Sequence, residues 1–224
     1  MTILAVVAHP DDELIGVGGT LAKHVSKGEK VHVVILSKTG ISRDNNEICE
    51  NYPEKRREQA RAACKKIGFE SLRFHSYPEN EFDTVPLLEI VQTIEDEISR
   101  VDPEIVYTHH FSDLNISHEY TCRAVMTAAR PLPNSNICQV LTFETLSSTE
   151  WSSPKASNQF TPRVFVDIED TLKQKIDALT KYEGELKQHP HPRSVENIRR
   201  NAKLWGAKAG LPAAEPFDVL YEIR

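Results

Sequence analysis

The chain has 224 residues, of which 39% are hydrophobic and 27% are charged, a balance typical of a soluble globular protein with a single domain over residues 1–224. Its net charge of −6 provides no basic surface for nucleic acid and disfavours binding to an anionic membrane. No apolar run approaches the roughly 18 residues of a spanning helix, and acidic residues closely follow the first apolar run, which is not a signal-peptide pattern. We therefore expect a cytoplasmic protein.

The first elements alternate between strand and helix patterns. Residues 3–8 form a continuous apolar run of strand length. Apolar residues then recur at helical spacing over residues 14–25, until Gly28 stops the pattern. Residues 31–36 are a second, β-branched strand candidate, and the polar residues 38–52 lack periodicity, so we expect a loop there.

A helix is predicted over residues 54–67, because Pro53 stands at its start and Gly68 just past its end. Residues 72–75 are a short strand candidate. A second helix follows over residues 86–98, where the apolar positions lie along one face.

The middle of the chain continues the alternation. Residues 105–108 form a strong strand candidate, and residues 117–130 a helix that Pro131 ends. Residues 140–144 and 164–168 are expected to be later strands.

The last part is predicted to contain helices over residues 171–188 and 194–209 and a closing strand over residues 219–223. Strands that alternate with helices favour an α/β fold, here a Rossmann-like three-layer sandwich with a mostly parallel central sheet and helices on both faces. In such sheets ligands bind at the carboxyl ends of the strands.

The four cysteines are Cys49, Cys64, Cys122 and Cys138, and none of them forms a Cys-x-x-Cys pair. Their wide spacing favours reduced, mostly buried thiols, which agrees with a cytoplasmic location.

The first chemical motif is Ala-His-Pro-Asp-Asp-Glu at residues 8–13, directly after the first strand. Zinc is bound by imidazole nitrogens and carboxylate oxygens, and the tight turn between His9 and Asp12 could place both on one ion. The same residues could also be an acidic helix start, because carboxylates favour the positive end of the helix dipole.

The second motif follows the strand at residues 105–108 and contains three histidines within residues 109–118. His118 would stand in the first turn of the next helix, at the same edge of the sheet as the first motif, and could supply a third ligand. A polar loop with incidental histidines is the alternative interpretation.

These motifs resemble those of the PIG-L/LmbE family of zinc-dependent de-N-acetylases. The resemblance rests on residues 8–13 with the glycines at 16–19, on Asp-Leu-Asn at 113–115 with His118, and on weaker similarities through to residues 214–217. It implies that His9, Asp12 and His118 bind zinc, with other divalent ions as alternatives. It also implies a homo-oligomer.

The resemblance implies a hydrolase that removes an N-acetyl group from a small amino-sugar-type substrate: an N-acetylglucosamine derivative, a glycoside or a nucleotide-linked sugar. Zinc would lower the pKa of a bound water and polarise the acetyl carbonyl, with Asp11 as the general base. Asn115 is assigned to the acetyl oxygen. Many relatives have an aspartate just before the last histidine ligand, where this chain has Ser117.

Substrate contacts are expected from residues that follow strands or resemble the family's contact residues. Arg56 or Arg57 matches the substrate arginine of the family, and a guanidinium suits a phosphate or sugar hydroxyl because it donates in pairs. Asp83 and His110 follow strands, and Trp151 could stack on a sugar. The alternatives are a solvated charge for the arginines and an ordinary rim aromatic for Trp151.

Features of the sequence bring three other functions into consideration. A nucleotide-binding module fails, because the glycines at residues 16–19 match neither the dinucleotide fingerprint nor a Walker motif with its lysine. A catalytically degenerate metal- or sugar-binding protein of the same fold remains an alternative, because of Ser117. A metallohydrolase of peptide amides is a third possibility, although nothing in the sequence indicates a peptide-binding edge.

Overall fold

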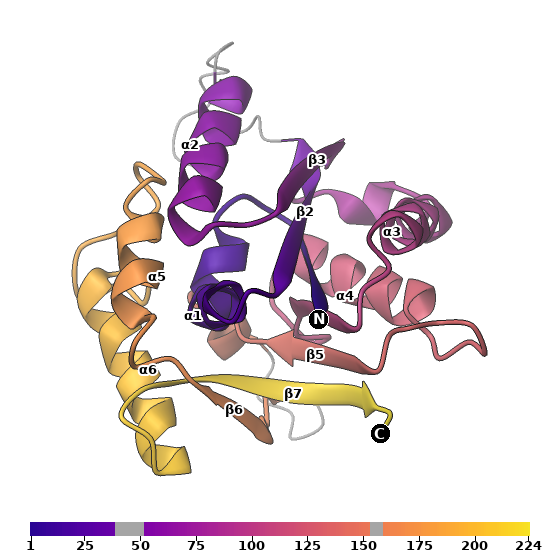
Figure 1. The fold of residues 1–224 in the computed structure, drawn as a ribbon. Helices are drawn as coiled ribbons and strands as arrows, with labels where there is room; N and C mark the ends of the chain where they lie inside the picture. The colour runs from indigo at the N-terminus through magenta and orange to yellow at the C-terminus, as the bar shows by residue number, and fades with distance from the viewer. Residues whose placement is uncertain (39–51, 153–158) are drawn as a thin grey trace.

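The computed structural model describes residues 1–38, 52–152 and 159–224. At its centre lies one seven-stranded sheet with the strand order β3-β2-β1-β4-β5-β7-β6 (Figure 1). The expected loop at residues 38–52, and Cys49 within it, lie outside the described residues except at the ends of that segment. The strands are β1 (Thr2–Val7), β2 (Lys30–Lys38), β3 (Ser71–Pro78), β4 (Ile105–His109), β5 (Gln139–Phe143), β6 (Val164–Asp167) and β7 (Ala214–Glu222).

The sheet is mostly parallel, as predicted. The strand β1 pairs in parallel with β2 on one side and with β4 on the other, and β3 and β5 extend the parallel part. Only β7 runs against its neighbours β5 and β6. The carboxyl ends of β1, β2, β4 and β5 therefore meet at one edge of the sheet.

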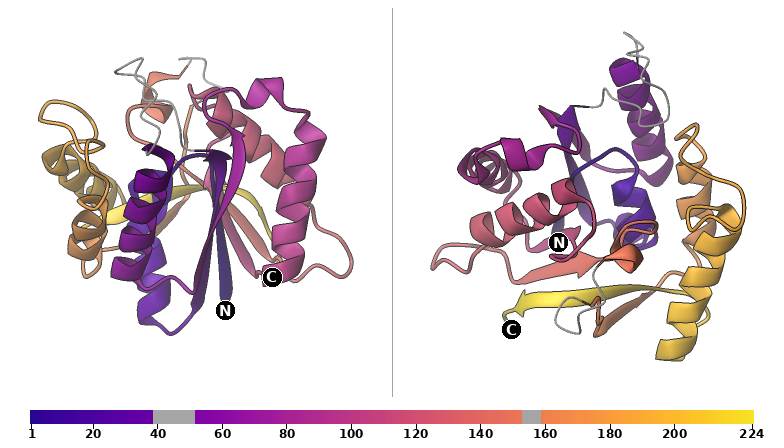
Figure 2. Two further views of the ribbon diagram at one scale, coloured as in Figure 1. Left: turned by 90° about the horizontal axis from the view of Figure 1, so that it is seen from above. Right: turned by 180° about the vertical axis from the view of Figure 1, so that it is seen from behind.

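Helices cover both faces of the sheet, which confirms the three-layer sandwich (Figure 2). Alternate residues of β1 enter opposite cores: Ile3, Ala5 and Val7 pack under α1, α2, α5 and α6, whereas the residues between them pack under α3 and α4. Because both faces are buried, the strand is apolar throughout. The helices are α1 (Asp12–Ser26), α2 (Tyr52–Ile67), α3 (Leu87–Val101), α4 (Ile116–Ala128), α5 (Leu172–Leu179) and α6 (Val195–Ala209).

One predicted helix is shorter than expected. The prediction over residues 171–188 holds only for α5, which ends at Leu179. The chain then turns inward at Tyr182, which is fully buried, and reverses at Gly184, whose φ of 84° is not a helical angle. Residues 185–193 consequently return over the carboxyl edge of the sheet rather than continuing along its side.

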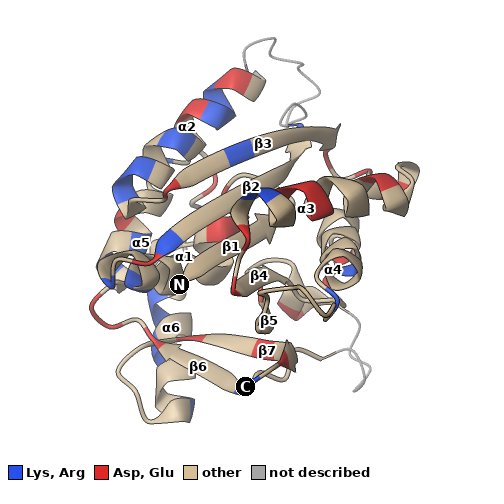
Figure 3. Ribbon diagram, turned by 45° about the vertical axis from the view of Figure 1, so that its right-hand side comes forward, with Lys and Arg blue, Asp and Glu red and all other residues tan. Residues whose placement is uncertain are grey.

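Charged residues of both signs are spread over the helices, with several Lys and Arg along α2 (Figure 3). Among the described residues, no helix combines the length and the apolar character that crossing a membrane requires.

Candidate active site

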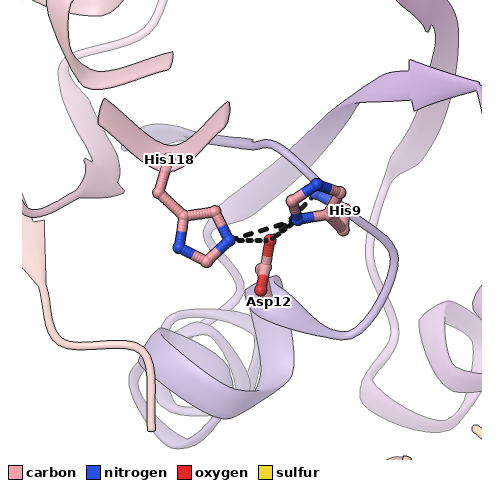
Figure 4. Close-up of side chains that lie close together, drawn as sticks. All are labelled: His9, Asp12 and His118. Atoms are coloured by element: carbon pink, nitrogen blue, oxygen red, sulfur yellow. Dashed lines mark hydrogen bonds and ion pairs between the residues drawn. The ribbon is translucent and has the colours of Figure 1, made fainter. Parts of the chain in front are cut away.

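Three buried side chains converge at the carboxyl edge of the sheet (Figure 4). His9 follows β1, Asp12 begins α1, and His118 lies in the first turn of α4. His9 Nδ1 is 3.1 Å from His118 Nε2, and Asp12 Oδ2 is 3.2 Å from each of these nitrogens. The structure thus brings together the three residues that the sequence predicted as metal ligands.

This cluster fits a divalent cation. Ligand atoms bound about 2.0–2.1 Å from one tetrahedral zinc ion would be about 3.3 Å apart, close to the spacing found here. Two ring nitrogens and a carboxylate oxygen directed at one point need a positive charge between them. Asp12 Oδ1 has no hydrogen-bond partner among the described residues, so it is also available. Three protein ligands leave a fourth position open, as in catalytic sites.

Asp113 orients His118 from behind. Its Oδ1 lies 3.0 Å from His118 Nδ1, which leaves the lone pair of Nε2 for the cluster. The hydroxyl groups of Ser148 and Thr149 both donate to this carboxylate. Burial by itself would raise the pKa of Asp113, but His118 and the two hydroxyl groups outweigh it and lower that pKa to about 2. Asp113 therefore stays ionised.

His109 supports the same histidine by stacking. The rings of His109 and His118 are nearly parallel, with centroids 4.0 Å apart. The backbone N–H of Ala8 donates to His109 Nε2 (3.0 Å), so the ring proton is on Nδ1 and can be donated to Thr145 (3.1 Å). Burial lowers the pKa of His109 to about 3, and the ring remains neutral.

Asp11 lies beside the cluster in an unusual backbone conformation, with a φ of 110°. Its carboxylate is buried and accepts a hydrogen bond from Arg193 Nη1 (3.2 Å), while Arg56 Nη2 is 4.0 Å away. Burial raises the pKa of Asp11 well above its ordinary value, and the positive charge of Arg193 opposes this. The N–H of Asp11 donates to Glu13 (3.0 Å).

The two arginines near Asp11 share one acidic partner. Arg56 Nη1 is 3.0 Å and Arg193 Nη1 is 3.5 Å from carboxylate oxygens of Glu185. Each arginine is also fixed by a backbone oxygen, Arg56 by Pro10 (2.9 Å) and Arg193 by Leu146 (3.1 Å). The guanidinium groups are therefore held in place.

A cavity of about 460 Å³ opens above the cluster. Of the predicted substrate-contact residues, Arg56 and Trp151 line it, as does Asn115. The side-chain oxygen of Asn115 caps α4 by accepting from the N–H of Ser117 (2.9 Å), and its nitrogen donates to Asn80 (2.9 Å). The lining consists of His9, Asp11, Asp12, Arg56, Glu79, Asn80, Leu114, Asn115, His118, Ser147, Ser148, Trp151, Glu185, Lys187, His191 and Arg193.

The structure places three predicted substrate-contact residues outside the cavity lining. Arg57 lies over the ring of Phe74, 5.5 Å from its centroid, because consecutive helical residues point in different directions. Asp83 is exposed on a short 3₁₀ helix. His110 is fully buried, and its ring packs 4.4 Å from that of Phe111.

Ser117 is fully buried, and its hydroxyl oxygen has no hydrogen-bond partner among the described residues. No role is predicted from the sequence for Asp113, Glu185 or Arg193. For Asp113 the signal was its place in the Asp-Leu-Asn motif, and for Arg193 its place in His-Pro-Arg-Ser at residues 191–194. Glu185 gave no signal, because only the reversal of the chain after α5 brings it to the cavity.

Comparisons with known proteins agree with this geometry. The family model described as GlcNAc-PI de-N-acetylase (PIG-L) matches residues 4–129, more than half of the chain. The chain is 32% identical over 188 residues to YaiS, an uncharacterized deacetylase of Escherichia coli K12, and the match covers 81% of this chain and 90% of YaiS.

Solved structures share the fold. The N,N′-diacetylchitobiose deacetylase of Pyrococcus horikoshii superposes with a TM-score of 0.79 at 18% identity, covering 98% of this chain and 83% of that one. GalB, the 4-carboxy-2-hydroxymuconate hydratase of Pseudomonas putida KT2440, gives 0.79 at 24% identity, covering 100% and 98%. At these identities the likeness establishes the fold, and the reaction has to be argued from the site.

Proposed function

The chain belongs to the PIG-L family and is an N-deacetylase, and from this premise we propose that it is a zinc-dependent hydrolase of small N-acetylated amino-sugar substrates. The observation that carries the proposal is the convergence of His9, Asp12 and His118 beside the buried Asp11, on the floor of one cavity. The sugar nature of the substrate is supported by the matching family model, which is described as a GlcNAc-PI de-N-acetylase.

A zinc ion held by the three ligands would lower the pKa of water and polarise the acetyl carbonyl. Asp11 takes the proton of the attacking water as general base and then delivers it to the leaving amine. Arg193 holds one carboxylate oxygen of Asp11, which leaves the other oxygen for this proton.

Two further residues assist the reaction: Asp113, which lies behind the ligand His118, and Asn115, which lies in the cavity wall. Asp113 keeps His118 in the tautomer that directs Nε2 at the cluster. The amide nitrogen of Asn115 carries two hydrogens, one of which is donated to Asn80, and the second is directed to the acetyl oxygen in this proposal.

The test is to purify the protein without chelator, measure bound metal, and assay acetate release from a panel of N-acetylglucosamine derivatives. We expect about one metal ion per chain, and acetate release by the wild type that Asp11→Asn abolishes. The matched control is Asp96→Asn, a charge removal on the exposed side of α3, which should keep full activity.

Failure to bind any metal, even after zinc is added back, would exclude the proposed centre. Metal binding without acetate release from any member of the panel would favour a binding protein, or a different reaction on the same fold.

A further inference from the structure

Two large apolar side chains stand at the cavity above the cluster. Leu114 is 60% exposed and Trp151 is 54% exposed, and both line the cavity. Every other described residue of the lining is polar or charged. We call Leu114 and Trp151 the apolar lip.

The two loops that carry the lip are tied together. Asp113, next to Leu114, accepts hydrogen bonds from Ser148 and Thr149, which begin the short 3₁₀ turn that contains Trp151. The same carboxylate contacts His118, so the lip is fixed relative to the metal ligands. The Trp151 ring also meets the ring of His191 edge-on, with centroids 6.3 Å apart.

Exposed apolar side chains in an otherwise polar cavity indicate a ligand with an apolar part. Removing apolar surface from water contributes about 25 cal/mol per Å² of binding free energy, and this is gained only when a ligand covers these side chains. A cavity of about 460 Å³ is within the usual range for small-molecule sites of about 300–1,000 Å³. It therefore has room for more than an acetamido group.

We propose that the apolar lip binds an aromatic or aliphatic aglycone, so that the substrate is an N-acetylated amino sugar with an apolar substituent. This inference rests on the proposed function, because the acetamido group must reach the ligands on the floor of the cavity. The polar walls then face the sugar hydroxyls, and the aglycone extends along Leu114 and Trp151.

The experiment measures binding apart from turnover. The zinc-loaded wild type is titrated calorimetrically with methyl β-D-glucosaminide and phenyl β-D-glucosaminide, amines that need no deacetylation. The phenyl compound should bind about tenfold more tightly, the ratio expected from covering one aromatic ring. Trp151→Ala combined with Leu114→Ala should reduce this ratio to near one, and Trp151→Phe should retain most of it.

The control is Leu204→Ala, which removes a side chain of 54% exposure on α6, away from the cavity, and should leave the ratio unchanged. Equal affinities of the wild type for the methyl and phenyl compounds would contradict the proposed role of the apolar lip. A preference for the phenyl compound that persists in the variant with both alanine substitutions would contradict it as well. Acetate release from the N-acetylated glycosides is assayed in parallel. If no acetate is released while the preference for the phenyl compound is intact, the proposed function is refuted, but the binding role of the apolar lip is retained.

Discussion

At the scale of single residues, the backbone turn that positions the Asp11 side chain has a cost in conformational free energy. A φ of 110° is unfavourable for any residue with a Cβ, by about 1–3 kcal/mol. The turn persists because the carbonyl oxygen of Asp11 accepts from the N–H groups of Leu14 and Ile15 in the first turn of α1. The backbone therefore holds the Asp11 carboxylate beside the cluster, and Arg193 fixes its orientation.

Replacement of Arg193 should impair catalysis more than metal binding. Arg193→Gln removes the charge that steadies Asp11, and we expect kcat/KM to fall by about 10- to 100-fold, mostly in kcat, with unchanged metal content. Arg193→Lys should recover part of the loss. Arg199→Gln, at an exposed position of α6, is the control. A variant of Arg193 with wild-type kcat would contradict this role.

A second residue governs acid stability. Glu97 on α3 binds Arg73 and His75 of β3 and Arg100 of its own helix, at 2.7–3.0 Å. Burial alone would raise the pKa of Glu97, but the partners, Arg100 foremost, together lower it below its ordinary value of 4.5. Because the unfolded chain then binds the proton more readily, Glu97 contributes stability above about pH 4.5 that is lost as the pH falls below that value.

Glu97→Gln should therefore lower the free energy of unfolding at pH 7 by about 1 kcal/mol, a value that already allows for solvent screening of the ion pairs. It should also make the loss of stability below about pH 4.5 less steep. Urea unfolding at a series of pH values measures both effects. Asp96→Asn, exposed in the middle of the same helix, should change neither. An acid profile identical to that of the wild type would rule out this contribution.

At the scale of elements, α1 approaches β5 very closely. A Cβ added to Gly16 would lie 2.1 Å from the buried ring of Phe143, whereas one added to Gly18 would lie 3.2 Å from the side chain of Leu14. This contact brings the first turn of α1, with Asp12, against the strand ends. The glycines that suggested a nucleotide-binding loop thus serve helix packing.

Two alanine substitutions test this close approach on one helix. Gly16→Ala should destabilise the protein by about 1–3 kcal/mol, because Phe143 has no room to move. Gly18→Ala should be near neutral, since the gain of about 1 kcal/mol in helix propensity offsets a mild crowding. Thermal unfolding of both variants decides the matter, and equal stabilities would contradict the packing described.

At the scale of the whole molecule, the proposed metal centre joins distant parts of the chain. Zinc added to chelator-treated protein should raise the unfolding free energy by about 2.7 kcal/mol when free zinc is 100 times the dissociation constant, and the Tm by about 5–10 °C. His118→Ala should abolish this shift, and His189→Ala, at an exposed position, should keep it. The same shift in the His118 variant would show that zinc binds elsewhere.

Much of the molecule follows from local sequence. The sequence pattern predicted a strand at the position of each of the seven observed strands, although β7 begins at Ala214 rather than at residue 219. The order of elements predicted the three-layer α/β sandwich. The cytoplasmic location, the single domain and the homo-oligomer remain predictions.

The sequence motifs, through the family that they resemble, predicted the three residues of the proposed metal centre, and the parallel strand pattern predicted that these residues lie at one edge of the sheet. The residues that complete the cavity became clear only from the folded structure. It separated Arg56 from Arg57, excluded Asp83 and His110 from the lining, and brought in Arg193. The physical reason is that such contacts depend on side-chain direction and on the reversal of the chain after α5, which no local pattern of residues encodes.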